Sequence, residues 1–244
     1  MTSTRRASVL IAAAGLGTRS GLAYPKTLYP VSGKPILVHL LELFSSIDKK
    51  PTIIVSPEGF QSIQDCIEEY NFSAYLVLQE QPKGMGDAVL RFVDSPAYSE
   101  SKEIVLAWGD IPFIQKETLE TLISEHFHQA NDFTFPTQIV EEAYTLVKRD
   151  EYSQIIDVIE TRENELTPRR GEREMGLFVF NKSKIFSALK LDSKKKYSKL
   201  SGEHGFLYII SNLVAQGYKV EALPIAKKLD LMSLNNISDL GEFK

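Results

Sequence analysis

Cysteine is almost absent from this chain, which has one, Cys66, among 244 residues. No disulfide can therefore form within the chain, and a zinc site built from paired cysteines and histidines is excluded. The four histidines show no spacing typical of a metal site with a carboxylate partner. The Gly-x-Ser-x-Gly sequence of serine hydrolases is also missing. Cys66 lies in a helical pattern, where we expect a buried, unreactive thiol.

Excess positive charge and long apolar runs are lacking too. The 28 Lys and Arg residues are outnumbered by 32 Asp and Glu, so the net charge of −4 gives no general attraction to nucleic acid or to an anionic membrane. No stretch approaches the roughly 20 apolar residues of a membrane span. The apolar run behind Arg5 and Arg6 is too short for the secretory signal that it resembles. We expect a cytoplasmic protein with no nucleic-acid and no membrane partner.

The hydrophobic content of 43% is enough for one substantial core. Strand-like runs alternate with helical patterns, which predicts a Rossmann-like α/β fold whose mixed, mostly parallel sheet carries helices on both faces. The expected strands are Val9–Ala13, Thr52–Val55, Tyr75–Gln79, Ile104–Trp108 and Asp132–Phe135. The expected helices are Ile36–Ser45, Phe60–Tyr70, Asp87–Asp94 and Lys116–Gln129.

From Tyr144 onward the pattern changes to shorter pieces, which predict a small β-rich insertion. The pieces are Tyr144–Lys148, Ile155–Glu160 and Met175–Asn181, followed by a helix at Gly205–Gln216 and a strand at Lys219–Leu223. The charged stretch Thr161–Glu174 is typical of a mobile, solvated loop, because acidic and basic residues alternate in it. We expect a single domain over residues 1–244, made of two halves, 1–140 and 141–244.

A glycine-rich turn follows the first strand-like run. Gly15 and Gly17 let the backbone bend tightly and bring its N–H groups close to an anion, while Arg19 and Lys26 supply positive charge. Ligands of such sheets bind at the carboxyl ends of the strands, so a phosphate site is expected here. A Gly-x-Gly pair alone, however, is better explained by an ordinary strand-to-helix turn.

The longer string is more specific. Residues 15–19 (Gly-Leu-Gly-Thr-Arg), then Pro25-Lys26 and a Gly-Lys-Pro at 33–35, resemble the N-terminal signature of sugar-1-phosphate nucleotidylyltransferases, with Ser20 in place of the usual Met. The chain is similar to the uridylyltransferase domain of bacterial N-acetylglucosamine-1-phosphate uridylyltransferases. This resemblance implies that the first half binds nucleotide and that the catalytic residues are Arg19 and Lys26. The nucleotide-binding residues it implies in the turn are Ala13, Ala14, Gly15, Gly17 and Thr18.

The segment 79–89 contains a strand end, a glycine-rich turn and a helix start. A connector that merely caps a helix would look the same. The segment also resembles the family's Glu-Gln-Pro-x-Gly-Thr-Gly-His-Ala, which implies that Gln79, Gly84 and Met85 bind the nucleotide and that Gln79 reads the uracil edge. Met85 replaces the family's Thr, and Asp87 stands where the family often has His.

A third motif is the apolar strand 104–108 that ends in Gly109-Asp110. An aspartate after a strand is most often a turn former or a helix cap. In the family that this chain resembles, the aspartate of Gly-Asp-x-Pro is a Mg²⁺ ligand, and Asn235 matches the second ligand. A hard cation takes oxygen ligands and keeps several waters, so these two residues and phosphate oxygens are enough. The resemblance therefore implies Mg²⁺ as the cofactor.

Three positions of the second half match sugar-binding positions of the family: Glu160, Glu174 and Gly176. Glu174 stands where the family usually has Asn. An ionised carboxylate only accepts hydrogen bonds, so we expect an unusual acceptor sugar.

Together the motifs predict transfer of a nucleotidyl group from a nucleoside triphosphate, UTP in the first place, to a sugar 1-phosphate. The product would be a nucleotide sugar, with pyrophosphate released. Two alternatives stay open at this point: cytidylyl or guanylyl transfer to another phosphorylated acceptor, and a catalytically inactive protein that binds nucleotide sugars. The sequence is also compatible with a homo-oligomer.

Overall fold

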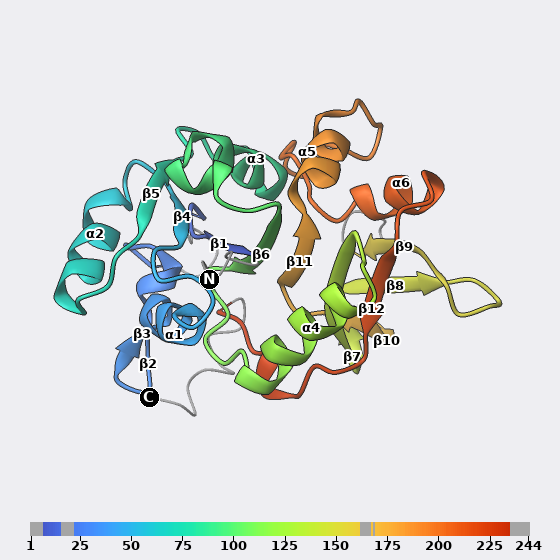
Figure 1. Ribbon diagram of the computed structural model, residues 1–244, viewed down its shortest axis with the longest axis horizontal. Helices are drawn as coiled ribbons and strands as arrows, with labels where there is room; N and C mark the ends of the chain where they lie inside the picture. The colour runs from blue at the N-terminus through green and yellow to red at the C-terminus, as the bar shows by residue number, and fades with distance from the viewer. Residues whose placement is uncertain (1–6, 16–21, 162–166, 168, 235–244) are drawn as a thin grey trace, which may run out of the picture.

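The computed structural model describes residues 7–15, 22–161, 167 and 169–234. Its centre is an eight-stranded mixed sheet in the order β10-β7-β11-β6-β1-β4-β5, with β12 paired to β7 (Figure 1). These strands are β1 (Ser8–Ala12), β4 (Thr52–Val55), β5 (Tyr75–Leu78), β6 (Glu103–Trp108), β7 (Phe133–Ala143), β10 (Arg169–Glu174), β11 (Leu177–Asn181) and β12 (Val220–Leu223). Two short strands, β2 (Pro30–Val31) and β3 (Lys34–Pro35), form a separate pair.

The side of the sheet that contains β1 is parallel. Strand β1 pairs in parallel with both β4 and β6, and β4 pairs in parallel with β5. Beyond β6 the direction changes, because β11 runs antiparallel to β6 and to β7, and β10 runs antiparallel to β7. Successive side chains of a strand point to opposite faces. Val9 and Ile11 accordingly pack into one buried cluster and Leu10 into the other.

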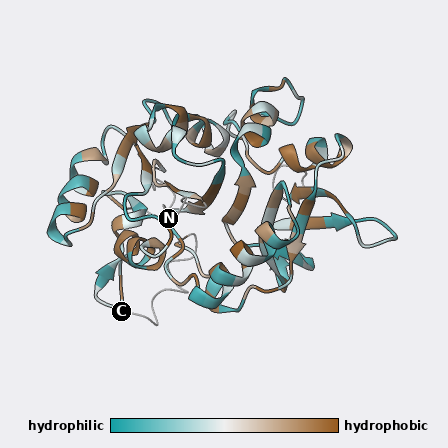
Figure 2. Cartoon of the chain, in the orientation of Figure 1, coloured by the Kyte–Doolittle hydropathy of each residue, from teal (hydrophilic) through white to brown (hydrophobic). Residues whose placement is uncertain are grey.

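Helices cover both faces, as the alternating pattern predicts. The helices α1 (Ile36–Phe44), α2 (Phe60–Glu69) and α4 (Lys116–His128) bury their apolar residues in the first cluster. The helices α3 (Met85–Leu90), α5 (Lys182–Lys190) and α6 (Ile209–Ala215) pack in the second. Figure 2 shows β6 and β11 as mainly hydrophobic between these layers. No helix in the described part of the chain is long and apolar enough to cross a bilayer. The Rossmann-like α/β fold is confirmed.

The β-rich insertion is present as a hairpin of β8 (Thr145–Arg149) and β9 (Ile155–Glu160), which extends to the right in Figure 1. The expectation of a loop over Thr161–Glu174 is wrong for its last part, because residues 169–174 form β10. These charged residues pair with β7 at the edge of the sheet, where one side faces solvent. A methyl group on Gly171 would lie 2.3 Å from the Leu146 side chain, so β10 packs closely over β8.

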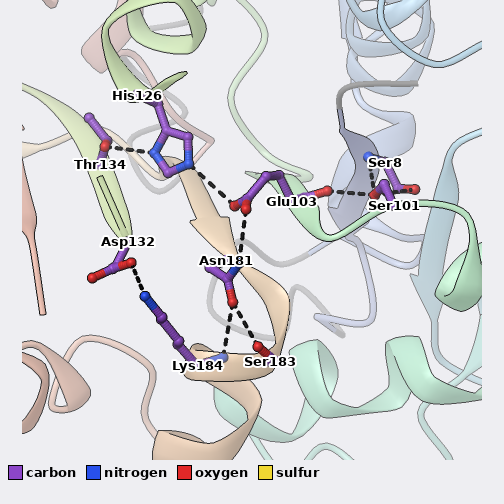
Figure 3. Close-up of polar contacts among 9 residues, drawn as sticks. All are labelled: Ser8, Ser101, Glu103, His126, Asp132, Thr134, Asn181, Ser183 and Lys184. Atoms are coloured by element: carbon purple, nitrogen blue, oxygen red, sulfur yellow. Dashed lines mark hydrogen bonds and ion pairs between the residues drawn. The ribbon is translucent and has the colours of Figure 1, made fainter. Parts of the chain in front are cut away.

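A buried polar network lies at the start of β6, at the opposite end from Trp108 (Figure 3). The His126 ring contacts Thr134 Oγ1 at 2.8 Å and Glu103 Oε2 at 3.3 Å, and Glu103 Oε1 accepts from Asn181 Nδ2 at 2.9 Å. Asn181 also caps α5 by accepting from the N–H of Lys184. The network joins α4, β7, β6 and α5, and it is structural.

Candidate active site

The loops after β1 and β6 are joined directly. The two strands pair in parallel with Ala12 opposite Trp108, so they end at the same edge of the sheet. Just beyond, the N–H of Gly109 donates to the carbonyl of Ala12 at 2.9 Å. A methyl group on Gly109 would lie 2.9 Å from that same oxygen, so only glycine fits without a shift. The motif Gly109-Asp110 is thereby held beside Ala13, Ala14 and Gly15.

Part of the predicted phosphate turn can be placed. Ala13 and Ala14 are buried, and the N–H of Ala13 donates to Ile54 of β4 at 2.9 Å. Gly15 is exposed at the end of this segment. Gly17, Thr18 and Arg19 lie outside the described residues, so their predicted roles stay predictions.

Lys26 and Asp110 come together although they are far apart in the sequence. Lys26 begins the short 3₁₀ helix η2 (Lys26–Leu28), directly after Pro25. Pro25 packs against the start of α2, where a methyl group on Gly59 would lie 2.8 Å from its ring. Burial raises the pKa of the Asp110 carboxyl, and the positive charge of Lys26 counteracts that rise. A predicted phosphate-binding cation thus acts electrostatically on the predicted metal ligand.

The C-terminal segment reaches the same place. The N–H of Leu234, the last described residue, donates to the carbonyl oxygen of Asp110 at 3.0 Å. Asn235 is the next residue in the chain and lies outside the described residues. The sequence predicts Asp110 and Asn235 as the two Mg²⁺ ligands. The backbone of Asp110 is hydrogen-bonded to Leu234, the residue directly before Asn235.

Asp230 holds this segment in place, and nothing in the sequence analysis identified it. Its side chain is fully buried and accepts three hydrogen bonds, from the N–H of Gln115 (2.6 Å), Thr118 Oγ1 (2.8 Å) and the N–H of Lys227 (2.7 Å). Gln115 is the N-cap of α4, and its own side chain makes no capping bond. Ser, Thr, Asp or Asn usually caps a helix, and α4 has none of them at its N-cap. This is the one sign in the sequence that a distant residue accepts the hydrogen bonds of the α4 start.

The residues predicted for the sugar have different environments. Glu174 is only 2% exposed, and its carboxylate accepts from the N–H of Gly176 at 2.5 Å and from Thr145 Oγ1 at 3.1 Å. Burial raises the pKa of Glu174, and the negative charge of Asp110 adds to the rise, while Arg173 and the two hydrogen bonds oppose it. Glu160 ends β9 with an exposed side chain.

Gly176 connects the sugar side to the loop after β6. It has a φ of +78°, and a methyl group there would lie 2.6 Å from Ile111 and 2.7 Å from the Trp108 ring. Its carbonyl accepts from the N–H of Trp108 at 2.9 Å. The turn between β10 and β11 is therefore packed against the residues on both sides of the Gly109-Asp110 motif.

Gln79 directly follows β5 and is 5% exposed. Its amide Nε2 donates to the Gly84 carbonyl at 3.0 Å and to Asp87 Oδ2 at 2.9 Å. Gly84 has a φ of +94°, and a methyl group on it would lie 2.5 Å from the His204 carbonyl. Met85 is the first residue of α3 and is partly buried. Gln79 is therefore hydrogen-bonded to Gly84, and Met85 follows Gly84 directly at the start of α3. The three residues predicted to bind the nucleotide thus belong to one segment between β5 and α3.

The segment 202–205 packs against this loop. The N–H of His204 donates to the Lys83 carbonyl at 2.7 Å, and the N–H of Gly86 donates to the His204 carbonyl at 3.0 Å. A hollow of about 410 Å³ lies between loop residues 82–87 and residues 197–204. Burial and the charge of Lys196 lower the pKa of His204, with Asp87 opposing, so the imidazole is neutral at pH 7.

The donor set fits Mg²⁺ better than a softer metal. No group of three or more His, Cys, Asp and Glu side chains that could hold a metal occurs among the residues that the structure describes. Asp110 instead offers a single buried carboxylate with Lys26 nearby. Mg²⁺ is commonly bound through one or two protein oxygens, with phosphate oxygens and waters completing its shell. The site is thus suited to a metal that arrives with a phosphorylated ligand.

The loops after β1 and β6, with Gly15 in the first and Asp110 in the second, meet at one edge of an open α/β sheet, an arrangement that fits a nucleotidyltransferase. The chain belongs to the family of the MobA-like NTP transferase domain, which it matches over residues 9–198. It is 28% identical over 235 residues to the bifunctional protein GlmU of Alkalilimnicola ehrlichii, covering 94% of this chain and 48% of that protein. The chain thus spans about half the length of the curated relatives that it matches.

Two solved structures have the same fold. One is a putative glucose-1-phosphate thymidylyltransferase from Bacillus anthracis in complex with a sucrose, with a TM-score of 0.72, 18% identity, and coverage of 90% of this chain and 87% of that one. The other is HddC from Yersinia pseudotuberculosis complexed with GMP-PN, with a TM-score of 0.69, 18% identity and 97% coverage of both chains.

Proposed function

We propose that this protein transfers a nucleotidyl group from a nucleoside triphosphate to a sugar 1-phosphate, giving a nucleotide sugar and pyrophosphate. The observation that carries the proposal is the environment of Asp110 after β6, where the charge of Lys26 acts on its buried carboxyl and the N–H of Leu234 donates to its backbone carbonyl. The similarity to GlmU over 94% of the chain is in line with the motifs, whose resemblance to sugar-1-phosphate uridylyltransferases makes UTP the first nucleotide to test.

The chemistry needs little from the protein beyond position and charge. An oxygen of the sugar phosphate attacks the α-phosphorus, a new P–O bond forms, and the bond to the β-phosphate breaks as pyrophosphate leaves. A phosphate monoester has its second pKa near 6, so the attacking group is already mostly ionised at neutral pH and no general base is required. The protein must hold the attacking and leaving oxygens in line and neutralise the charge that they bring together.

Each of the predicted site residues has a separate task in this scheme. Lys26 neutralises the α-phosphate and the attacking phosphate, and Asp110 together with Asn235 would hold Mg²⁺, which supplies further neutralisation of the phosphate oxygens. Arg19 binds the β- and γ-phosphates. The packed turn at Gly176 fixes the sugar side of the site against the loop that carries Asp110.

The test is a pyrophosphate-release assay with Mg²⁺ in which UTP, dTTP, CTP, GTP and ATP are crossed with sugar 1-phosphates and other phosphorylated acceptors. We expect turnover with one nucleotide and one sugar 1-phosphate, and we expect Lys26→Ala or Asp110→Ala to lower kcat/KM by about 10²–10³. Lys116→Ala is the matched control, since Lys116 is an exposed lysine outside the motifs that pairs with Glu120. Full activity in folded Lys26→Ala, or turnover only with acceptors other than sugar phosphates, would refute the proposal.

A further inference from the structure

Residues 190–200, which we call the basic loop, differ in charge from the rest of the chain. Acidic residues outnumber basic ones over the whole sequence, but the ten residues 190–199 contain five lysines and a single acidic residue, Asp192. The lysines are Lys190, Lys194, Lys195, Lys196 and Lys199. The net charge of −4 is therefore an average that conceals a local excess of positive charge.

Apolar side chains are exposed in the same basic loop. Leu191 is 48% exposed, Tyr197 56% and Leu200 65%. They are three of the eleven large apolar side chains that are exposed in the described part of the chain. Figure 1 shows the loop in orange, projecting beside α5 at the top of the view. Basic and apolar side chains are thus offered to a partner together.

Backbone hydrogen bonds give the basic loop a defined shape. The N–H of Ser198 donates to the Glu203 carbonyl at 2.8 Å, and the N–H of Gly205 donates to the Lys196 carbonyl at 2.9 Å. The loop is thereby fixed to the segment 202–205, which packs against the loop between β5 and α3. A surface that is already ordered loses less conformational entropy when it binds.

We propose that the basic loop docks on an anionic membrane surface, with its lysines at the lipid headgroups and its leucines inserted among them. Clusters of about four to eight basic residues are typical of segments that recognise acidic lipids. Aliphatic side chains gain by burial at the boundary between headgroups and acyl chains, whereas binding of single-stranded nucleic acid depends on aromatic side chains that stack on bases. Leu191 and Leu200 therefore favour a lipid surface over nucleic acid.

This docking is peripheral and needs no membrane-spanning helix. The expectation of no membrane partner rests on the net charge and on the lack of long apolar runs, and neither property registers a short basic loop. The inference is also independent of the proposed reaction, because neither the lysines nor the leucines of the basic loop belong to the predicted site. Its test needs no substrate and no turnover.

The experiment measures co-sedimentation of the full chain with vesicles of equal parts phosphatidylglycerol and phosphatidylcholine. We expect binding that weakens as salt is added, and no binding to vesicles of phosphatidylcholine alone. Replacing Lys194, Lys195 and Lys196 together by Gln should lower the affinity about tenfold or more. Lys195 also pairs with Asp157 at 2.8 Å, so the expected loss is set below the full effect of three lysines.

A matched variant separates the basic loop from net charge. Lys49→Gln, Lys116→Gln and Lys228→Gln together remove three exposed lysines elsewhere and change the net charge equally. The affinity of this control for the acidic vesicles should stay within about twofold of the wild type. A general effect of net charge would instead weaken both triple variants to the same extent.

The leucines are tested at constant charge. Leu191→Ser combined with Leu200→Ser should lower the affinity for acidic vesicles about tenfold or more. Ile139→Ser combined with Tyr152→Ser removes two exposed apolar side chains outside the basic loop and should leave the affinity unchanged.

The wild-type protein gives a test that does not depend on the folding of any variant. Absence of binding to the acidic vesicles at low salt would overturn the inference, as would equal weakening in the two lysine variants or unchanged affinity in the folded leucine variant. Tighter binding to a single-stranded oligonucleotide than to the acidic vesicles would also overturn it and assign the basic loop to nucleic acid.

Discussion

The N–H of Leu234 donates to the carbonyl oxygen of Asp110 at 3.0 Å. This bond connects the end of the described chain with the loop after β6, which carries Asp110, the first predicted Mg²⁺ ligand. The buried carboxylate of Asp230, four residues earlier, ties the same segment to the first turn of α4. The division into a nucleotide-binding half and a sugar-binding half stays a prediction, but the two halves share this centre.

Replacing Asp230 should weaken both the fold and the site. Asp230→Ala leaves the N–H groups of Gln115 and Lys227 and the buried Thr118 hydroxyl without their acceptor, and we expect the free energy of unfolding to fall by about 2–4 kcal/mol. Turnover at a temperature where the variant is folded should also fall, because the segment that carries Leu234 is no longer held. Urea denaturation gives the first quantity. Asp94→Ala, at a more exposed position, is the control and should change stability by less than about 0.5 kcal/mol.

Asn235→Ala should raise the Mg²⁺ concentration needed for half-maximal turnover. Removing one of two protein oxygens from a metal site is expected to weaken apparent metal affinity at least about tenfold. Titration of activity with Mg²⁺ at saturating nucleotide measures this, and Asn236→Ala is the neighbouring control. An Asn235→Ala enzyme with the wild-type Mg²⁺ dependence would remove Asn235 from the predicted ligand set.

Glu174 should make the protein less stable as the pH rises. Its folded pKa is raised above 4.5, the ordinary value of a glutamate. The folded state therefore keeps a proton that the unfolded state releases, and stability falls as the pH rises from about 4.5 through the raised folded pKa. Glu174→Gln removes this loss of stability with rising pH, and the glutamine side chain can still accept a hydrogen bond from the N–H of Gly176. We expect its free energy of unfolding to depend less on pH above 4.5 and to equal or exceed that of the wild type at pH 7.5.

The pKa of the neighbouring Glu172 is shifted in the opposite direction, so this residue serves as a comparison. Burial would raise its pKa, but hydrogen bonds from Arg149 and Thr137 outweigh burial and lower the pKa below the ordinary value. Its contribution to stability is present above pH 4.5 and is lost as the pH falls through the lowered folded pKa. Glu172→Gln should therefore be less stable than the wild type at pH 7.5. If both variants shift stability in the same direction at that pH, the assignment for Glu174 is wrong.

Gly176→Ala should lower the free energy of unfolding far more than Gly217→Ala, although both glycines have the same backbone conformation. Gly176 and Gly217 have φ values of +78° and +76°, but a methyl group meets Trp108 and Ile111 at the first and nothing within 4 Å at the second. Gly217→Ala should cost only the left-handed strain, about 1–2 kcal/mol. Gly176→Ala adds a clash and should also lower kcat/KM, because the displaced residues flank Asp110. Thermal melts and steady-state kinetics of the two variants decide the point.

Cys66 should be unreactive while the protein is folded. Burial, together with the negative charge of Glu69, raises its pKa to about 11, so almost no thiolate exists at pH 8. A thiol reagent such as DTNB should therefore modify Cys66 only after unfolding, and the modification rate should rise steeply with denaturant. Rapid labelling of the native protein at pH 8 would contradict the buried position.

The alternation of apolar runs and helical patterns was enough to predict the sheet and its two helical layers, because strands covered on both faces are recognisable as continuous apolar runs. Strand β10 was missed because its residues are mostly charged and lack the apolar pattern by which buried strands are recognised. The strand forms by pairing with β7 at the edge of the sheet, and the local sequence does not show this pairing. The helix expected from Gly205 begins at Ile209, since the preceding segment bonds to the loop at Lys83. Long-range partners of this kind leave no local pattern.

The candidate site divides in the same way. Lys26 and Asp110 could be predicted as functional from their motifs, and the structure brings them together. The hydrogen bond between Gln79 and Asp87 depends on the rotamer of a side-chain amide. The capping of α4 by Asp230 depends on a tertiary contact between residues 115 positions apart in the sequence. Neither could be read from spacing alone.

The buried carboxylate of Asp230 and the helix start that it caps are 115 residues apart. At about 5–20 residues per second, a ribosome takes roughly 6–23 s to make the intervening chain. During this interval β6 and the start of α4 have already been made, but the carboxylate that caps α4 has not. The start of α4 therefore gains its buried acceptor only after the segment that contains Asp230 has been synthesised and docks against it.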